Sequence, residues 1–184
     1  MSSPLIIVGL GNPGIEYDRT RHNAGFIALD HLREQLNASD FQTDPKFFAE
    51  LSTTVLEGRK IILAKPTTYM NESGKTVRTL LDFYKLSPED FVVLHDDLDI
   101  APGTLRTTES SRSAGNNGVE SIIEHFGTQD FFRIRIGIGR PVEVAGVCMP
   151  SHDYVLGRFS EDEFAALEKL FPEIETIIRQ RIKG

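Results

Sequence analysis

The sequence predicts one α/β domain spanning residues 1–184, built on a mixed, mostly parallel β-sheet with helices on both faces. Short apolar runs of buried-strand length alternate along the chain with segments of helical periodicity. The length of 184 residues suits a single domain, and 40% hydrophobic with 26% charged residues is an ordinary globular composition. Repeats and a composition break that would mark a linker are absent. These observations favour a layered α/β architecture.

The first half of the chain supplies a strand, a helix and a hairpin. Residues 5–8 form an apolar run typical of a buried strand, and Asn23 is a candidate N-cap for a helix over 24–36. Residues 51–56 and 60–64 flank a short polar turn, which is the pattern of a β-hairpin.

The middle of the chain continues the alternation. A second helix is expected from Asn71 or Ser73 to about Tyr84, and the Ser-Pro pair at 87–88 ends it. Residues 91–94 form another buried strand. A turn at 99–103 then leads to an edge strand near 105–108.

The last third contains the clearest strand pattern. A third helix is expected over 117–126, followed by a strand over 131–138 in which apolar residues alternate strictly. Ser160, with Glu163 three residues later, is expected to cap one final helix extending to Ile182.

The overall charge argues at first against a nucleic-acid-binding protein. The net charge is −7 with a pI of about 5.2, and such proteins are usually basic. However, segments 82–99 and 160–175 each carry six acidic residues and one lysine, so the rest of the chain sums to +3. Neither a membrane span nor a signal peptide is recognisable, which favours a soluble cytoplasmic protein. The single Cys148 excludes an intrachain disulfide and a cysteine-based zinc site.

Polar side chains gather in three segments that follow the predicted strands: 9–23, 65–71 and 95–99. Binding sites of open α/β sheets form at the carboxyl ends of strands. If the three strands are parallel neighbours, one cleft receives Asn12, His22, Asn71 and either Asp96 or Asp97.

This set of residue types has a chemical logic. A histidine can take a proton from water, a carboxylate on its other nitrogen fixes the tautomer, and asparagine amides can stabilise an oxyanion. The pattern is that of a hydrolase in which His22 activates water. Covalent catalysis has little support, because no Gly-x-Ser-x-Gly motif occurs and Cys148 has no base beside it.

Each feature also has a simpler or different interpretation. The glycines of 9–14 match the spacing of a dinucleotide-binding loop, although a polar segment separates them from the following helix. The acidic cluster Asp96, Asp97 and Asp99 could bind magnesium or form a solvated turn. His22 could be a solvated loop residue, and Asn71 could be only a helix N-cap. The five histidines form no short-range metal-binding pair.

A second group of residues concerns charge. Arg133 and Arg135 are expected on one face of the 131–138 strand, about 7 Å apart by strand rise. Arg106, Arg112 and Arg140 could join them, and paired arginines suit phosphate groups. A solvated strand face with cross-strand salt bridges explains the same pattern.

Six motifs, in order, make the chain resemble the bacterial-type peptidyl-tRNA hydrolase family. They are Gly-Leu-Gly-Asn-Pro-Gly at 9–14, Tyr17 with Thr-Arg-His-Asn-Ala-Gly at 20–25, Lys-Pro-Thr-Thr-Tyr-Met-Asn-Glu-Ser-Gly at 65–74, His-Asp-Asp-Leu-Asp at 95–99, Phe-Arg-Ile-Arg-Ile-Gly-Ile-Gly-Arg-Pro at 132–141 and Tyr-Val-Leu-Gly-Arg-Phe at 154–159. The resemblance covers nearly the whole chain.

The resemblance implies cleavage of the ester that joins a peptide to the 3′ end of tRNA, without a metal or organic cofactor. It implies that His22 is the general base, that Asp96 orients it, and that Asn12 and Asn71 contact the peptide or the polarised carbonyl. A monomer acting on peptidyl-tRNA is expected. The residues implied in contacts with the acceptor end are Tyr17, Tyr69, Met70, Asn117, Arg106, Arg135 and Arg112.

The chain departs from the family pattern at two positions. Asn116 stands where the family usually has a histidine, and Thr108 stands where a lysine or arginine is frequent. Arg112 is expected to restore the missing charge. The alternatives are an RNA-binding protein of the same fold, related to chloroplast splicing factors, and a nucleotide-utilising enzyme.

Overall fold

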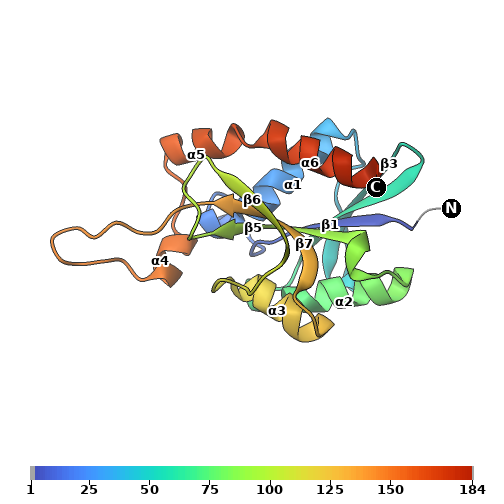
Figure 1. Cartoon of the computed structure of the whole chain (residues 1–184), viewed down its shortest axis with the longest axis horizontal. Coiled ribbons are helices and arrows are strands. Elements are labelled where there is room, and N and C mark those ends of the chain that lie inside the picture. Colours follow the sequence, from blue (N-terminus) through green and yellow to red (C-terminus); the bar gives the residue numbers. More distant parts are fainter. Residues whose placement is uncertain (1–2, 184) are drawn as a thin grey trace.

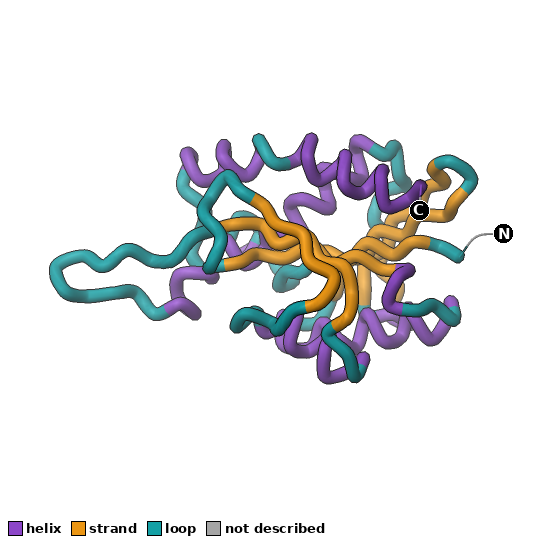
Figure 2. The backbone as a smooth tube through the Cα atoms, in the orientation of Figure 1, coloured by secondary structure: helices purple, strands orange, loops and turns teal. Residues whose placement is uncertain are grey.

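The protein contains one seven-stranded mixed sheet, seen in a computed structural model that describes residues 3–183 (Figures 1 and 2). The strand order is β2-β3-β4-β1-β5-β7-β6. The four central strands are parallel: β4 (Arg59–Pro66), β1 (Leu5–Gly9), β5 (Phe91–Asp97) and β7 (Asp130–Gly137). Antiparallel strands complete both edges: β3 (Ala49–Leu56) and β2 (Gln42–Asp44) on one side, β6 (Leu105–Ser110) on the other. The predicted fold class is confirmed.

Helices cover both faces of this sheet (Figure 1). On one face α1 (Ala24–Gln35) and α6 (Phe171–Lys183) pack on the odd-numbered residues of β1, such as Leu5 and Ile7. On the other face α2 (Ser73–Tyr84) and α3 (Asn117–Phe126) pack on Ile6 and Val8. Because successive side chains of a strand point to opposite faces, a strand covered on both faces is apolar throughout. The uninterrupted apolar runs of the sequence have this cause.

The hairpin between β3 and β4 is confirmed. Its turn residues Glu57 and Gly58 have φ angles of 52° and 80°, the left-handed pair of a two-residue hairpin turn. Glycine adopts this conformation without steric cost.

The prediction of one continuous C-terminal helix is wrong. Ser160 does form the expected capping box with Glu163. However, the helix that it caps, α5 (Glu161–Glu168), ends at Glu168, and a separate helix, α6, begins at Phe171. Pro172 explains the break, because it has no N–H to donate to the carbonyl of Glu168 and its ring would clash with that carbonyl in a continuous helix. In the first turn of α6, where no such bond is required, the proline is tolerated. The two helices therefore meet at a turn.

The expectation that residues 95–99 follow the strand that begins at Phe91 is also wrong. β5 continues to Asp97 and pairs with β7 up to Gly137. His95, Asp96 and Asp97 are thus buried strand residues and not loop residues. This extension places three charged or titratable side chains on the sheet itself.

A projecting segment follows β7 and returns through α4 (Ser151–Leu156), a short helix that the sequence patterns did not indicate (Figure 1). The remaining elements are short 3-10 helices at Ile15–Tyr17, Arg21–Asn23, Pro45–Phe47, Met70–Glu72 and Pro88–Asp90. Over residues 3–183, none of the helices has the length and apolar character needed to span a bilayer.

Candidate active site

A pocket of about 140 Å³ opens where β5 ends, between α3 and α4. The neighbouring strands β4, β1 and β5 are parallel, so the segments that follow them meet at this edge of the sheet. The pocket is lined by polar side chains from four elements, among them His22, Asp96, Asn116, Asn117 and His152.

His22 and Asp96 form the central contact of the pocket. Nδ1 of His22 lies 3.0 Å from each carboxylate oxygen of Asp96, and both side chains are buried. Since an ionised carboxylate only accepts hydrogen bonds, Nδ1 carries the proton and Nε2 keeps its lone pair. His22 therefore has the tautomer that a general base requires.

The environment of His22 shifts its protonation equilibrium. Burial alone lowers the pKa of the imidazole, but the negative charge and the hydrogen bond of Asp96 outweigh it and raise the pKa above 6.5. Asp96 therefore stabilises the imidazolium that forms when His22 takes up a proton.

Asn12 is held by its backbone and by its side chain. Its Oδ1 accepts a hydrogen bond of 2.8 Å from the Met70 amide, which orients the side chain. Its backbone exchanges two hydrogen bonds with the side chain of Asn23, at 2.8 and 3.0 Å. Asn23 was expected to cap α1, but its side chain makes no such bond and instead fixes the loop that carries Asn12. Asn12 is buried and is not among the residues that line the pocket with His22 and Asp96.

The other predicted substrate contacts lie in different settings. Asn117 lines the pocket at the start of α3, whereas Asn71 is exposed and does not cap α2. Met70 is buried against Gly118, where a Cβ would lie 2.4 Å from its sulfur. Tyr69 is exposed and Tyr17 is half-buried.

The three carboxylates of segment 95–99 have separate partners. Asp96 faces His22, Asp97 pairs with Arg135 at 2.8 Å, and Asp99 pairs with Arg140. Their divergence disagrees with the magnesium interpretation of this cluster. No group of three His, Cys, Asp or Glu side chains suited to a metal ion occurs in the described part of the chain.

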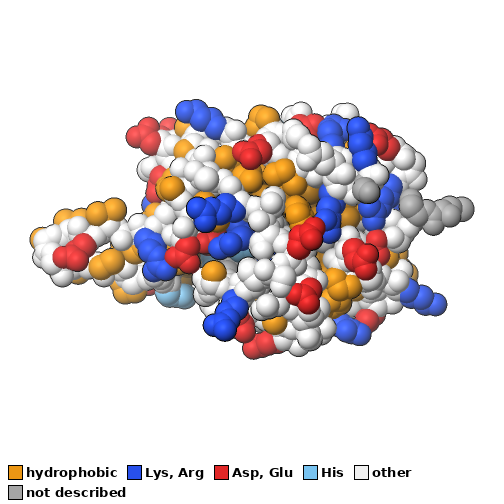
Figure 3. Space-filling model, viewed as in Figure 1, with side chains coloured by type: hydrophobic (Ala, Val, Ile, Leu, Met, Phe, Trp, Pro, Cys, Tyr) orange, Lys and Arg blue, Asp and Glu red, His pale blue; other side chains and the backbone are white. Residues whose placement is uncertain are grey.

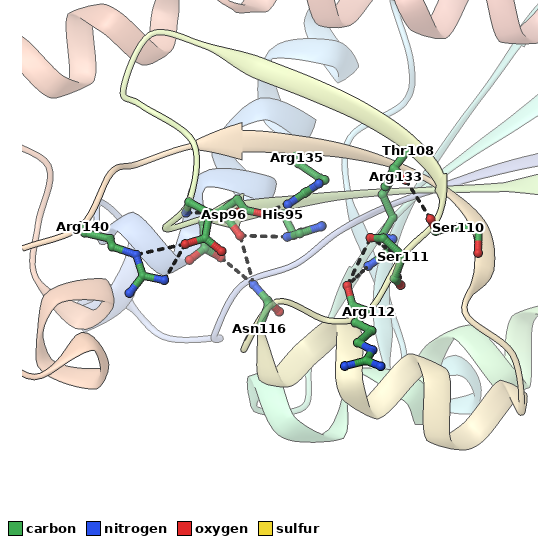
Figure 4. Close-up of polar contacts among 12 residues, drawn as sticks. His95, Asp96, Thr108, Ser110, Ser111, Arg112, Asn116, Arg133, Arg135 and Arg140 are labelled. Atoms are coloured by element: carbon green, nitrogen blue, oxygen red, sulfur yellow. Dashed lines mark hydrogen bonds and ion pairs between the residues drawn. The ribbon is translucent and has the colours of Figure 1, made fainter.

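The predicted arginine cluster is only partly available to a ligand. Arg133 is 1% exposed and donates hydrogen bonds to the carbonyls of Ser111 and Arg112, so it fits neither the phosphate-binding pair with Arg135 nor the solvated strand face (Figure 4). Its burial lowers its pKa to about 10. Arg106 and Arg112 are exposed, and Arg106 lies opposite the half-buried Arg135 in the β6–β7 ladder. Figure 3 shows several Lys and Arg side chains gathered near this edge of the sheet.

Comparison with known proteins agrees with this geometry. A family model described as peptidyl-tRNA hydrolase matches residues 6–184. The chain belongs to the peptidyl-tRNA hydrolase family. A relative of that name from Geobacillus kaustophilus is 47% identical over 179 residues, covering 97% of this chain and 93% of the relative. One from Bacillus cereus is 51% identical over 158 residues, covering 86% and 82%.

Solved structures of peptidyl-tRNA hydrolases have the same fold. The crystal structure of the enzyme from Acinetobacter baumannii is 35% identical, with a TM-score of 0.90, and the match covers 100% of this chain and 91% of that chain.

Sequence patterns assigned no role in the site to three residues that the structure places near it in this member of the peptidyl-tRNA hydrolase family. His95 donates from Nδ1 to the Asp96 carbonyl at 2.8 Å, and its burial lowers its pKa to about 4, so it is neutral. His152 reaches the pocket on α4, which no periodicity had indicated. Asn116 contacts Asp96, although the sequence singled it out only as the position at which the family usually has a histidine.

Proposed function

We propose that this chain hydrolyses the ester bond between the peptide and the tRNA of peptidyl-tRNA, releasing tRNA for reuse. The observation that carries the proposal is the buried His22–Asp96 pair, with Nδ1 at 3.0 Å from both carboxylate oxygens and Nε2 left as a base. The family membership agrees with this chemistry.

The reaction begins when Nε2 of His22 takes a proton from a water molecule, which attacks the ester carbonyl carbon. Asp96 stabilises the imidazolium that results. Nδ2 of Asn12 and the amide of Asn71 stabilise the tetrahedral oxyanion. When this intermediate collapses, the bond to the 3′ oxygen of tRNA breaks, and the imidazolium returns its proton to that oxygen. The products are a peptide carboxylate and an intact tRNA.

The acceptor end of the tRNA is proposed to lie along the pocket and the adjacent arginines. In this proposal the acceptor end contacts Asn117, which lines the pocket, and Met70, which packs against Gly118 of α3. Tyr17 and Tyr69 are proposed as further contacts, and Arg106, Arg112 and Arg135 as the positive charges that meet phosphates. We further propose that residues 1–184 act as a single domain, as a monomer in the cytoplasm, and without a cofactor.

The alternative of an RNA-binding protein without hydrolase activity is not supported by the relatives, which are named hydrolases. Incubation with N-acetyl-aminoacyl-tRNA separates the two functions. Hydrolysis predicts free tRNA and N-acetyl amino acid at catalytic enzyme concentrations. Saturable tRNA binding with no ester cleavage would contradict the proposal.

A further inference from the structure

Asn116 connects the pocket to the start of α3. Its Oδ1 accepts hydrogen bonds from the backbone amides of Gly118 at 3.0 Å and Val119 at 3.1 Å, which caps the helix. Its Nδ2 donates to Oδ1 of Asp96 at 3.0 Å and to the Asp96 carbonyl at 3.3 Å (Figure 4). The side chain is 7% exposed, so all four contacts are made inside the protein.

The orientation of this amide is determined by its partners. Two backbone N–H groups require an acceptor, so Oδ1 faces the helix, and Nδ2 is left to face the carboxylate. The contacts at the two ends of the Asn116 amide strengthen each other, because an amide whose oxygen accepts hydrogen bonds has more strongly donating N–H groups. The positive end of the ten-residue helix also favours a negative charge at this place.

Asp96 is thereby held from two sides. Its Oδ1 is shared by Nδ1 of His22 and Nδ2 of Asn116, while its Oδ2 contacts His22. The other groups around the pair do not compete for this carboxylate: Asp97 is paired with Arg135, and His95 is neutral and bonded to a backbone carbonyl. His152 on α4 is the remaining titratable side chain that lines the pocket.

We propose that Asn116 is a positioning residue, which fixes the Asp96 carboxylate toward His22 and so links the start of α3 to the general base. As an amide it does not titrate, so the link is the same at every pH at which the protein is folded. This inference rests on the proposed function, because it assigns Asn116 a role in the same reaction.

The test compares Asn116→Ser with Ser121→Ala. A serine keeps an oxygen for capping α3 but has no N–H to offer Asp96. Ser121 lies on the same helix and accepts a hydrogen bond from the Gly74 amide of α2, so its loss weakens the contact between α2 and α3 at a residue that does not line the pocket. We expect Asn116→Ser to lower kcat about tenfold with KM within about twofold, the loss typical of one hydrogen bond to a charged group. Ser121→Ala should lower the Tm and leave kcat unchanged.

A second measurement is independent of catalysis. The His22 pKa, followed by NMR of the imidazole Cε1–H without substrate, should fall toward 6.5 in Asn116→Ser because the carboxylate is less firmly held. A His22 pKa that is unchanged or raised, or a kcat within twofold of the wild type, overturns the positioning role, because loss of a donor to a carboxylate that keeps its place can only strengthen its pull on the imidazolium. If the wild type cleaves no peptidyl-tRNA, the proposed function fails, and the NMR titration still decides whether Asn116 positions Asp96.

Discussion

His22 and Asp96 are the residues on which the proposed chemistry depends, and both were predicted from the rule that sites form at strand ends. Arg133 shows the limit of that reasoning. Its alternation in the strand predicted a position open to phosphate or solvent, but Ser111 and Arg112 of the irregular segment after β6 accept its hydrogen bonds. A loop without periodicity leaves no signal of where it folds back, so sequence patterns could not reveal this burial.

The pH dependence of cleavage follows from the raised pKa of His22. Only neutral imidazole acts as a base, so kcat should rise with pH through a midpoint above 6.5. The same shift predicts that the His22–Asp96 pair adds stability below pH 6.5 and loses it as the pH rises through the folded-state pKa. A pH–rate profile with a wild-type midpoint below 6.5 would be inconsistent with this assignment. Asp96→Asn removes the charge and should move the midpoint down.

Elements were predicted better than their ends. The sheet, the hairpin and the helices α1 to α3 were recognisable from periodicity, whereas the length of β5 depends on pairing with β7. That pairing joins residues about 40 positions apart, as in Asp97 and Gly137, and local sequence carries no record of it. The break between α5 and α6 could have been inferred from Pro172 alone, because a proline in a helix interior removes a backbone hydrogen bond.

The packing of α1 on the sheet gives a prediction at this scale. A Cβ at Gly25 would lie 2.3 Å from the Leu94 carbonyl oxygen and 2.5 Å from the Leu10 amide, so the helix start touches the strands only because this side chain is missing. Gly25→Ala should cost about 3 kcal/mol, or a Tm loss of about 6–12 °C. It should also slow cleavage by moving His22. The exposed Glu34 on the same helix serves as the control, and Glu34→Ala should change stability by less than about 0.5 kcal/mol. Equal melting temperatures for the two variants would refute the packing argument.

Net charge is a property of the whole molecule, and it was a misleading guide to nucleic-acid binding. The net charge of −7 suggested a protein that avoids nucleic acid, but Arg106 on β6 and Arg112 directly after β6 are exposed. With few phosphate contacts and an acidic background, tRNA binding should be weak and sensitive to salt.

Arg106 is the position at which this can be measured. It is exposed on β6, and Arg106→Ala should reduce the log–log slope of tRNA affinity against salt by about 0.7 to 0.9, the effect of one phosphate contact. Arg135→Ala is a poorer probe, because it leaves buried Asp97 unpaired at a cost of about 3–5 kcal/mol. A salt slope unchanged in Arg106→Ala would exclude this side chain from phosphate binding.

The central claim is that His22 activates the attacking water. Single-turnover cleavage of N-acetyl-aminoacyl-tRNA tests it most directly, with wild type compared with His22→Ala and with His125→Ala as a control at an exposed histidine of α3. The account predicts that His22→Ala slows the chemical step by about 10² to 10⁴, the usual share of a positioned base, while His125→Ala cleaves at the wild-type rate. Near-full cleavage by His22→Ala would contradict it.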